Sequence, residues 1–129
     1  MTYRLHHVSV PSSPGSAERT RGFYGALLGL EEIPAPATIT SVDVIWFKLS
    51  GSTELHIFEE APRGDASLRH FCLVVDDLDA LRQRLNEAGY APWETEPIPG
   101  RPRFFCHDPS GNLIEFTIIV GNYLDHQDS

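Results

Sequence analysis

An internal repeat constrains the fold of this chain more than any other sequence feature. The first half opens with Leu5-His6-His7-Val8-Ser9-Val10 and the second with Leu68-Arg69-His70-Phe71-Cys72-Leu73, so both read Leu-x-His-apolar-x-apolar. A helical stretch and a glycine follow each motif, at Gly29 and Gly89. The 129 residues therefore hold two copies of one module. Neither copy alone has enough core to be stable, so we expect them to pack as one domain, residues 1–129.

The helix of the first half should span about 16–28, and Gly29 follows it as a C′ residue. Its inner face should carry Phe23, Leu27 and Leu28. The second helix should span about 77–88, with Asp77 as N-cap and Gly89 as C′ residue. Apolar residues with helical spacing form its inner face, namely Leu78, Leu81, Leu85 and Ala88.

Strand-like runs follow each helix. In the first half they cover about 37–40, 42–49 and 53–58, and in the second about 91–95, 103–107 and 112–120. Each half therefore reads βαβββ, which predicts an α+β fold with the halves in a pseudo-twofold arrangement. Module one should cover about 1–60 and module two about 66–121, with a linker at 60–65 and a polar tail at 122–129.

Composition excludes several classes of protein. Apolar residues make up 41% of the chain and charged residues 22%, which is typical of a globular protein. The net charge of −8 argues against binding to nucleic acid. No apolar run is long enough to cross a membrane, and the N-terminus does not resemble a signal peptide, so we expect a cytoplasmic protein. Cys72 and Cys106 are best interpreted as free thiols that fill space.

Two histidines and two glutamates recur at matching places in the repeat. His7 and His70 lie on the first strand of each half, and Glu54 and Glu115 on the last. Any one such histidine is more often structural than a ligand, but four matching residues are an unusual coincidence. Glu115 also lies among apolar residues, where a carboxylate needs a partner. The pattern predicts one divalent cation, of Zn, Ni, Mn, Co or Fe, bound by His7, His70, Glu115 and Glu54.

The fourth ligand has an alternative. Glu54 and His56 are two residues apart on one strand and so share a face. The repeat favours Glu54. His56 is the alternative ligand, or else a hydrogen-bond partner of a ligand or a proton carrier. His6 should point to the face opposite His7 and be structural, and His107 should stabilise the loop that begins at Asp108.

The chain resembles the vicinal oxygen chelate superfamily, which includes glyoxalases, bleomycin-resistance proteins and extradiol dioxygenases. The resemblance rests on stretches that together span almost the whole chain: Leu5-His6-His7-Val8, Phe23-Tyr24-Gly25-Ala26-Leu27-Leu28-Gly29-Leu30, Arg69-His70-Phe71, Val75-Asp76-Asp77-Leu78-Asp79-Ala80-Leu81 and Phe104-Phe105-Cys106-His107-Asp108-Pro109-Ser110-Gly111-Asn112-Leu113-Ile114-Glu115-Phe116.

The resemblance implies a curved mixed sheet around a central cleft that holds the cation. It places the usual ligands at His7, His70 and Glu115 and a fourth at Glu54, and it implies a homodimer, in some members with the site built across two chains. One departure is Pro11-Ser12-Ser13-Pro14-Gly15, which replaces the usual short acidic link after the first strand.

We therefore expect a metal-dependent lyase or isomerase of the glyoxalase type, acting on a small oxygenated molecule. Glu115 or Glu54 would act as the base, and Arg101, Arg103 and Trp46 would contact the substrate. One alternative is an Fe(II)-dependent, ring-cleaving dioxygenase, which three protein ligands would suit. The other is a non-catalytic protein that sequesters a ligand, as bleomycin-resistance proteins do.

Overall fold

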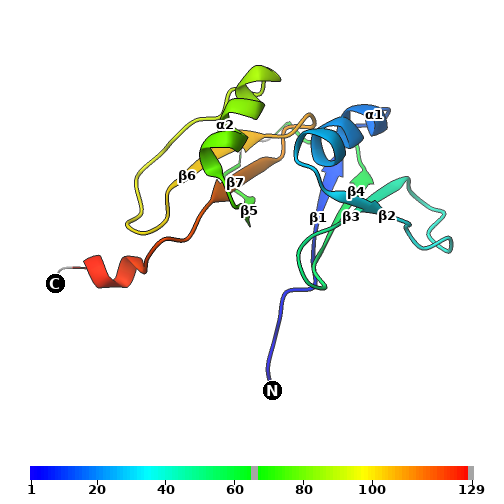
Figure 1. The fold of residues 1–129 in the computed structure, drawn as a ribbon. Helices are drawn as coiled ribbons and strands as arrows, with labels where there is room; N and C mark the ends of the chain where they lie inside the picture. Colours follow the sequence, from blue (N-terminus) through cyan, green and yellow to red (C-terminus); the bar gives the residue numbers. More distant parts are fainter. Residues whose placement is uncertain (65–66, 128–129) are drawn as a thin grey trace. The chain divides into compact units, whose positions relative to one another are not determined.

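The computed structural model describes residues 1–64 and 67–127 of the chain. The chain forms two compact units, residues 1–66 and 67–129, each with its own sheet and helix (Figure 1). The division lies at the predicted linker, of which residue 65 is outside the described residues. The single-domain organisation stays a prediction.

The first unit has the predicted βαβββ order. It contains β1 (His7–Ser12), α1 (Ala17–Thr20), η1 (Arg21–Leu27), β2 (Glu31–Ile33), β3 (Val44–Lys48) and β4 (Glu54–Glu59). Its four strands form a sheet in the order β1-β4-β3-β2. β1 runs parallel to β4, and the other two pairs are antiparallel.

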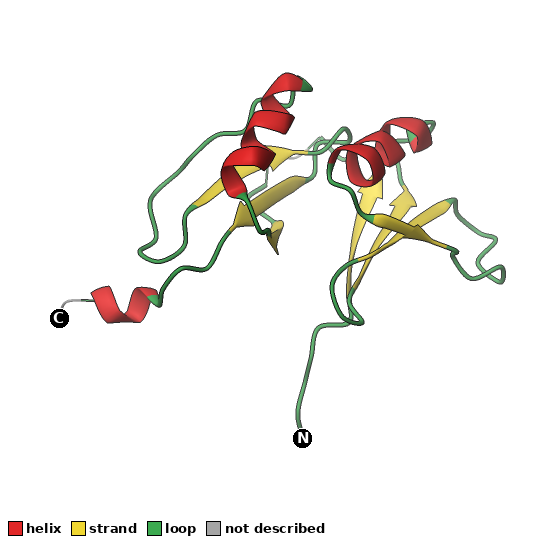
Figure 2. Ribbon diagram, viewed as in Figure 1, coloured by secondary structure: helices red, strands yellow, loops and turns green. Residues whose placement is uncertain are grey.

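The second unit repeats this plan with fewer strands. It contains β5 (His70–Val74), α2 (Leu78–Glu87), β6 (Arg103–His107), β7 (Leu113–Thr117) and the 3-10 helix η2 (Tyr123–His126). Its sheet has the order β5-β7-β6, with β5 parallel to β7 and β6 antiparallel to it. Two mixed sheets with helices confirm the α+β class (Figure 2).

The first predicted helix consists of two segments. α1 leads directly into η1, a π-helix in which Leu28 N donates to Phe23 O at 2.9 Å. Gly29 follows with a φ of 76°, as expected of a C′ glycine. Phe23 is buried as predicted, and so is Tyr24, which we did not expect on the inner face. Leu27 and Leu28 are half-buried.

The second predicted helix, at about 77–88, agrees more closely with the structure, where α2 spans Leu78–Glu87. Asp77 is the N-cap, and its side chain accepts a hydrogen bond from Ala80 N at 3.0 Å. Leu78, Leu81 and Leu85 are buried. The prediction for Ala88 is wrong: it is the C-cap residue, beyond the last turn that packs on the sheet, and it is exposed.

Two predicted strands are absent from the described residues. Residues 37–40 form a turn in which Ile39 N donates to Pro36 O, and the strand in this region is β2 instead. Within residues 91–95 there is only an isolated bridge between Trp93 and Phe105. Ala91 has a φ of 47° and the next residue is a proline, which lacks the N–H that a strand needs, so a regular strand cannot form there.

Each sheet has one apolar face, and the helix of its unit packs there (Figure 1). In the first unit Phe23 and Tyr24 meet Phe47, Leu55 and Ile57, all at most 1% exposed. In the second, the three buried leucines of α2 belong to a core with Phe104, Cys106, Ile114 and Phe116. Side chains alternate along a strand, so the residues between these point to the opposite face of each sheet. None of the helices in the described ranges has the length and apolar character needed to span a membrane.

The turn between β6 and β7 sets the register of the second sheet. Asp108 is 7% exposed, and its Oδ1 accepts hydrogen bonds from Ser110 N and Asn112 N, both at 2.9 Å. Its Oδ2 accepts a third from Asn112 Nδ2 at 2.8 Å. The bonds hold His107 opposite Leu113 and therefore place Glu115 opposite Phe105.

Asp108→Ala should destabilise the protein by about 1–3 kcal/mol, because it leaves the partly buried N–H groups of Ser110 and Asn112 without their acceptor. Chemical denaturation would measure the loss. Asp125→Ala, at an exposed position in η2, is the matched control and should leave the free energy of unfolding unchanged. Equal stability of the two variants would contradict this role of the turn.

Candidate functional site

In the second unit, the sheet face opposite α2 brings two predicted ligands together. His70 Nε2 lies 3.0 Å from Glu115 Oε1. The other ring nitrogen, Nδ1, donates to Leu68 O at 2.8 Å, which orients the imidazole. The His70 side chain is 34% exposed and that of Glu115 11%. An accessible imidazole nitrogen and a mostly buried carboxylate oxygen thus lie side by side.

Arg103 contacts the second oxygen of Glu115. Its Nη1 is 3.5 Å from Glu115 Oε2, and its Nη2 donates to Glu96 O at 3.0 Å. The guanidinium also lies over the ring of Phe105, 5.4 Å from its centroid. Arg101, the other predicted substrate-binding arginine, lies over the ring of Tyr123 at 5.1 Å. Both arginines thus have contacts within the second unit.

Cys72 lies on the same face and was not predicted to be near the site. It is opposite Glu115 in the register of β5 and β7. Cys72 is exposed by surface area, but partial desolvation of the thiol, followed by the charge of Glu115 and a hydrogen bond to it, raises the pKa of Cys72 to about 11. The thiol is therefore protonated at neutral pH.

In the first unit, three aromatic rings form a stack on the face opposite η1. The ring of His56 lies between those of Trp46, at 3.6 Å, and His7, at 4.1 Å between centroids. His56 Nε2 donates to Glu54 Oε1 at 2.8 Å. The predicted ligands His7 and Glu54 and the alternative His56 therefore lie on one face, and Trp46 contacts His56.

The strand registers correct one step of the repeat argument. His7 lies opposite Glu54 in the first sheet, whereas His70 lies opposite Leu113 in the second. Glu54 therefore matches Leu113, and His56 matches Glu115. Trp46 lies opposite His56 just as Phe105 lies opposite Glu115, which gives the same alignment. The equivalence of Glu54 and Glu115 expected from their spacing is wrong by two residues.

Glu54 is a carboxylate among imidazoles. The hydrogen bond from His56 is the main cause that holds the pKa of Glu54 below its usual value, and the charges of His6, His56 and His7 act in the same direction. His6 is exposed and approaches His7, with 3.0 Å between their Nδ1 atoms, so it contacts the ring from which we expected it to point away. His107 is also exposed, and its ring lies 4.9 Å from that of Trp93.

The four predicted ligands divide between the units, two in each. Across residues 1–64 and 67–127, no group of three or more His, Cys, Asp or Glu side chains is arranged to hold a metal ion. His7 and Glu54 belong to the first unit, and His70 and Glu115 to the second.

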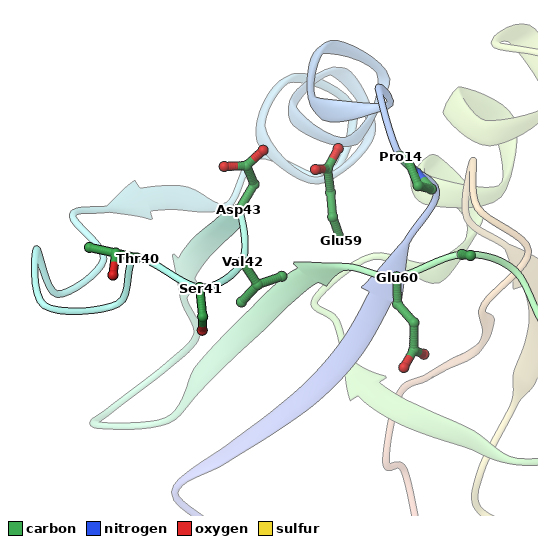
Figure 3. A pocket seen from close by; sticks show the side chains of 8 residues that line it. Pro14, Thr40, Ser41, Val42, Asp43, Glu59 and Glu60 are labelled. Atoms are coloured by element: carbon green, nitrogen blue, oxygen red, sulfur yellow. The ribbon is translucent and has the colours of Figure 1, made fainter.

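A separate pocket of about 390 Å³ lies in the first unit, away from these ligands (Figure 3). Glu59 lines it and accepts a hydrogen bond from Gly15 N at 2.8 Å. The carboxylates of Asp43 and Glu59 lie on one side in Figure 3, and that of Glu60 points the other way. The remaining lining residues are Pro14, Thr40, Ser41, Val42 and Ala61.

The stack in the first unit should be visible in tryptophan fluorescence. In a Trp93→Phe background only Trp46 emits, and His56→Ala should change its intensity and wavelength, because the contacting ring is lost. His6→Ala in the same background is the control and should leave the Trp46 spectrum unchanged. Indistinguishable spectra for the two histidine variants would argue against the stack.

Comparisons with known proteins agree with this fold. The profile of the Glyoxalase/Bleomycin resistance protein/Dioxygenase superfamily matches residues 4–116. A solved glyoxalase family protein from Bacillus anthracis is 34% identical with a TM-score of 0.82, over 92% of this chain and 97% of that chain. No curated protein gave a significant match.

Two more distant structures share the fold. The fosfomycin resistance protein FosX from Mesorhizobium loti is 19% identical with a TM-score of 0.71, over 98% of each chain. A lactoylglutathione lyase from Agrobacterium tumefaciens is 19% identical with a TM-score of 0.68, over 91% of this chain and 94% of that chain.

Proposed function

Because the chain belongs to the glyoxalase, bleomycin resistance protein and dioxygenase superfamily, we propose that it is a metal-dependent lyase or isomerase of the glyoxalase type. It binds one divalent cation and, through it, a small oxygenated substrate. The observation that carries this proposal is the pairing of His70 Nε2 with Glu115 Oε1.

The geometry of this pair fits a metal ion. Nitrogen and oxygen ligands bind such ions at about 2.0–2.2 Å, so two ligands at right angles are roughly 3 Å apart. The two atoms here are separated by 3.0 Å. Metal-binding histidines usually donate their other N–H to a carbonyl or carboxylate, and His70 donates to Leu68 O. Distance and orientation both favour ligation through Nε2.

We assign His7, His70 and Glu115 as ligands, with His56 as the favoured fourth. His56 occupies the place in its sheet that Glu115 occupies in the other, and its ring stacks on that of His7. Glu54, the fourth ligand favoured by spacing, then acts as the hydrogen-bond partner of His56. Carboxylate partners of this kind orient ligating histidines.

The surroundings of Glu54 and Glu115 suggest a different chemical role for each. When bound, the cation supplies positive charge that stabilises an oxyanion developing on the substrate. Glu54 is 26% exposed and ionised, so it can accept a proton from the carbon beside a carbonyl. Glu115, the other predicted catalytic carboxylate, is less exposed and is held by His70 and Arg103.

We also propose that the protein acts as a homodimer on a small molecule and not on nucleic acid. The net charge of −8 supports the second part, because phosphates would be repelled. Sedimentation analysis would determine the oligomeric state.

Protein purified without added metal should contain about one divalent ion per chain. His70→Ala and Glu115→Ala should each lose most of it, because each removes a direct ligand. His126→Ala, an exposed histidine in η2, is the matched control and should keep full occupancy. Elemental analysis measures all four proteins, and unchanged occupancy in His70→Ala would refute the site.

Protein purified without added metal also distinguishes the proposed lyase or isomerase from the two alternative functions. Turnover of an α-hydroxy or α-keto substrate with Ni²⁺ or Zn²⁺ and without O₂ uptake supports the lyase or isomerase. Bound iron with O₂ uptake would instead identify a dioxygenase. Metal-free protein that binds an aromatic or cationic ligand tightly would identify a sequestering protein.

The fourth ligand can be tested by comparing His56→Ala with Glu54→Gln. Loss of a residue that hydrogen-bonds to a ligand typically lowers metal affinity about 10–100-fold, so Glu54→Gln should have an effect of this size. His56→Ala should lower the affinity further, because it removes a direct ligand. Competition with a chelator measures both affinities. The reverse order would restore Glu54 as the direct ligand.

A further inference from the structure

We propose that Arg103 is a positioning residue for Glu115, and not the substrate contact expected from its place in the sequence. It holds Oε2 of that carboxylate and so directs Oε1 toward His70. This inference rests on the proposed function, because it assigns Arg103 to the same metal centre.

Three contacts fix the Arg103 guanidinium. Nη2 donates to Glu96 O at 3.0 Å, Nη1 lies 3.5 Å from Glu115 Oε2, and the planar group lies over the ring of Phe105. The side chain is only 16% exposed, so little of it is left for a substrate. Planar guanidinium groups suit this combination of fork and stack, which a lysine cannot reproduce.

The strand register explains why Arg103 reaches Glu115. Arg103 lies opposite Thr117, and Phe105, two residues further along β6, lies opposite Glu115. Arg103 is therefore a diagonal neighbour of Glu115 on one sheet face, a distance that a long side chain can span. Phe105 lies beside Arg103 on the same face, with the guanidinium over its ring.

One polar atom of Arg103 lies in an unfavourable environment. Arg103 Nε is buried and has no hydrogen-bond partner among the described residues. An unpaired buried donor lowers the stability of the folded protein. The contact with Glu115 offers a compensating interaction, since it is charge-assisted and lies between two largely buried groups.

The two oxygens of Glu115 consequently have different environments. Oε1 lies 3.0 Å from His70 Nε2, and Oε2 faces Arg103. A carboxylate held in this way presents one oxygen to a cation. Without Arg103, Glu115 could rotate about its terminal torsion, which has a broad energy profile.

The test compares Arg103→Met with Arg84→Met, which makes the same chemical change at an exposed position of α2, the helix on the opposite face of the same sheet. Arg103→Met should lower Co²⁺ affinity about 10–100-fold and alter the visible spectrum of the Co²⁺-loaded protein, because the Glu115 orientation changes. Arg84→Met should match the parent in both. Equal affinity and spectra for all three proteins would overturn the proposal.

A metal-free measurement separates this inference from the proposed function. In the apo protein, the ¹⁵N resonances of the His70 ring, assigned by their loss in His70→Asn, should shift in Arg103→Met and not in Arg84→Met. If the parent binds no Co²⁺, the proposed function fails, and the His70 resonances still decide the role of Arg103. Should Arg103→Met not fold, Arg103→Gln replaces it. Unshifted His70 resonances in a folded Arg103 variant would overturn the inference.

Discussion

A nearly buried carboxylate on an otherwise apolar strand is the constraint on which the second unit depends. The side chain of Glu115 is 11% exposed, and its neighbours Ile114 and Phe116 are core residues. Burial of an ionised group is costly unless it is paired. The sheet meets this need by placing His70 and Arg103 on either side of the carboxylate, and the hydrogen-bonded turn at Asp108 keeps the strand in the register that makes both contacts possible.

Much of the fold could be predicted because the repeat and the helix signals are local. The N-cap at Asp77 and the glycine after each helix depend on neighbouring residues alone. Edge strands were harder to predict from the sequence, because they form by pairing with a neighbouring strand and have no distinctive composition. β2 consists of Glu31, Glu32 and Ile33, which do not look like a strand, yet they pair with Lys48, Phe47 and Trp46. Residues 37–40 have a strand-like sequence, but they pair with no strand of the first sheet.

The predicted ligands of each unit share one sheet face, as their strand positions predicted, but the correspondence between the two units was not foreseen. Matching glutamate to glutamate aligned Glu54 with Glu115. Matching the apolar residues that pack under the helices aligns Leu55 with Ile114 instead, and so His56 with Glu115. Core packing sets the register, so the apolar positions were the better guide. The contact of Arg103 with Glu115 crosses two strands and depends on that register.

The two units present chemically different versions of one face. In the second, Glu115 is held between an imidazole and a guanidinium and is 11% exposed, an arrangement that favours a fixed ligand. In the first, Glu54 is 26% exposed, and His56 both hydrogen-bonds to it and stacks between two rings. A proton acceptor needs access to its substrate, whereas a ligand needs a fixed position. The two units thus hold carboxylates at different positions of a shared plan, and under the proposed function their unequal surroundings favour different tasks.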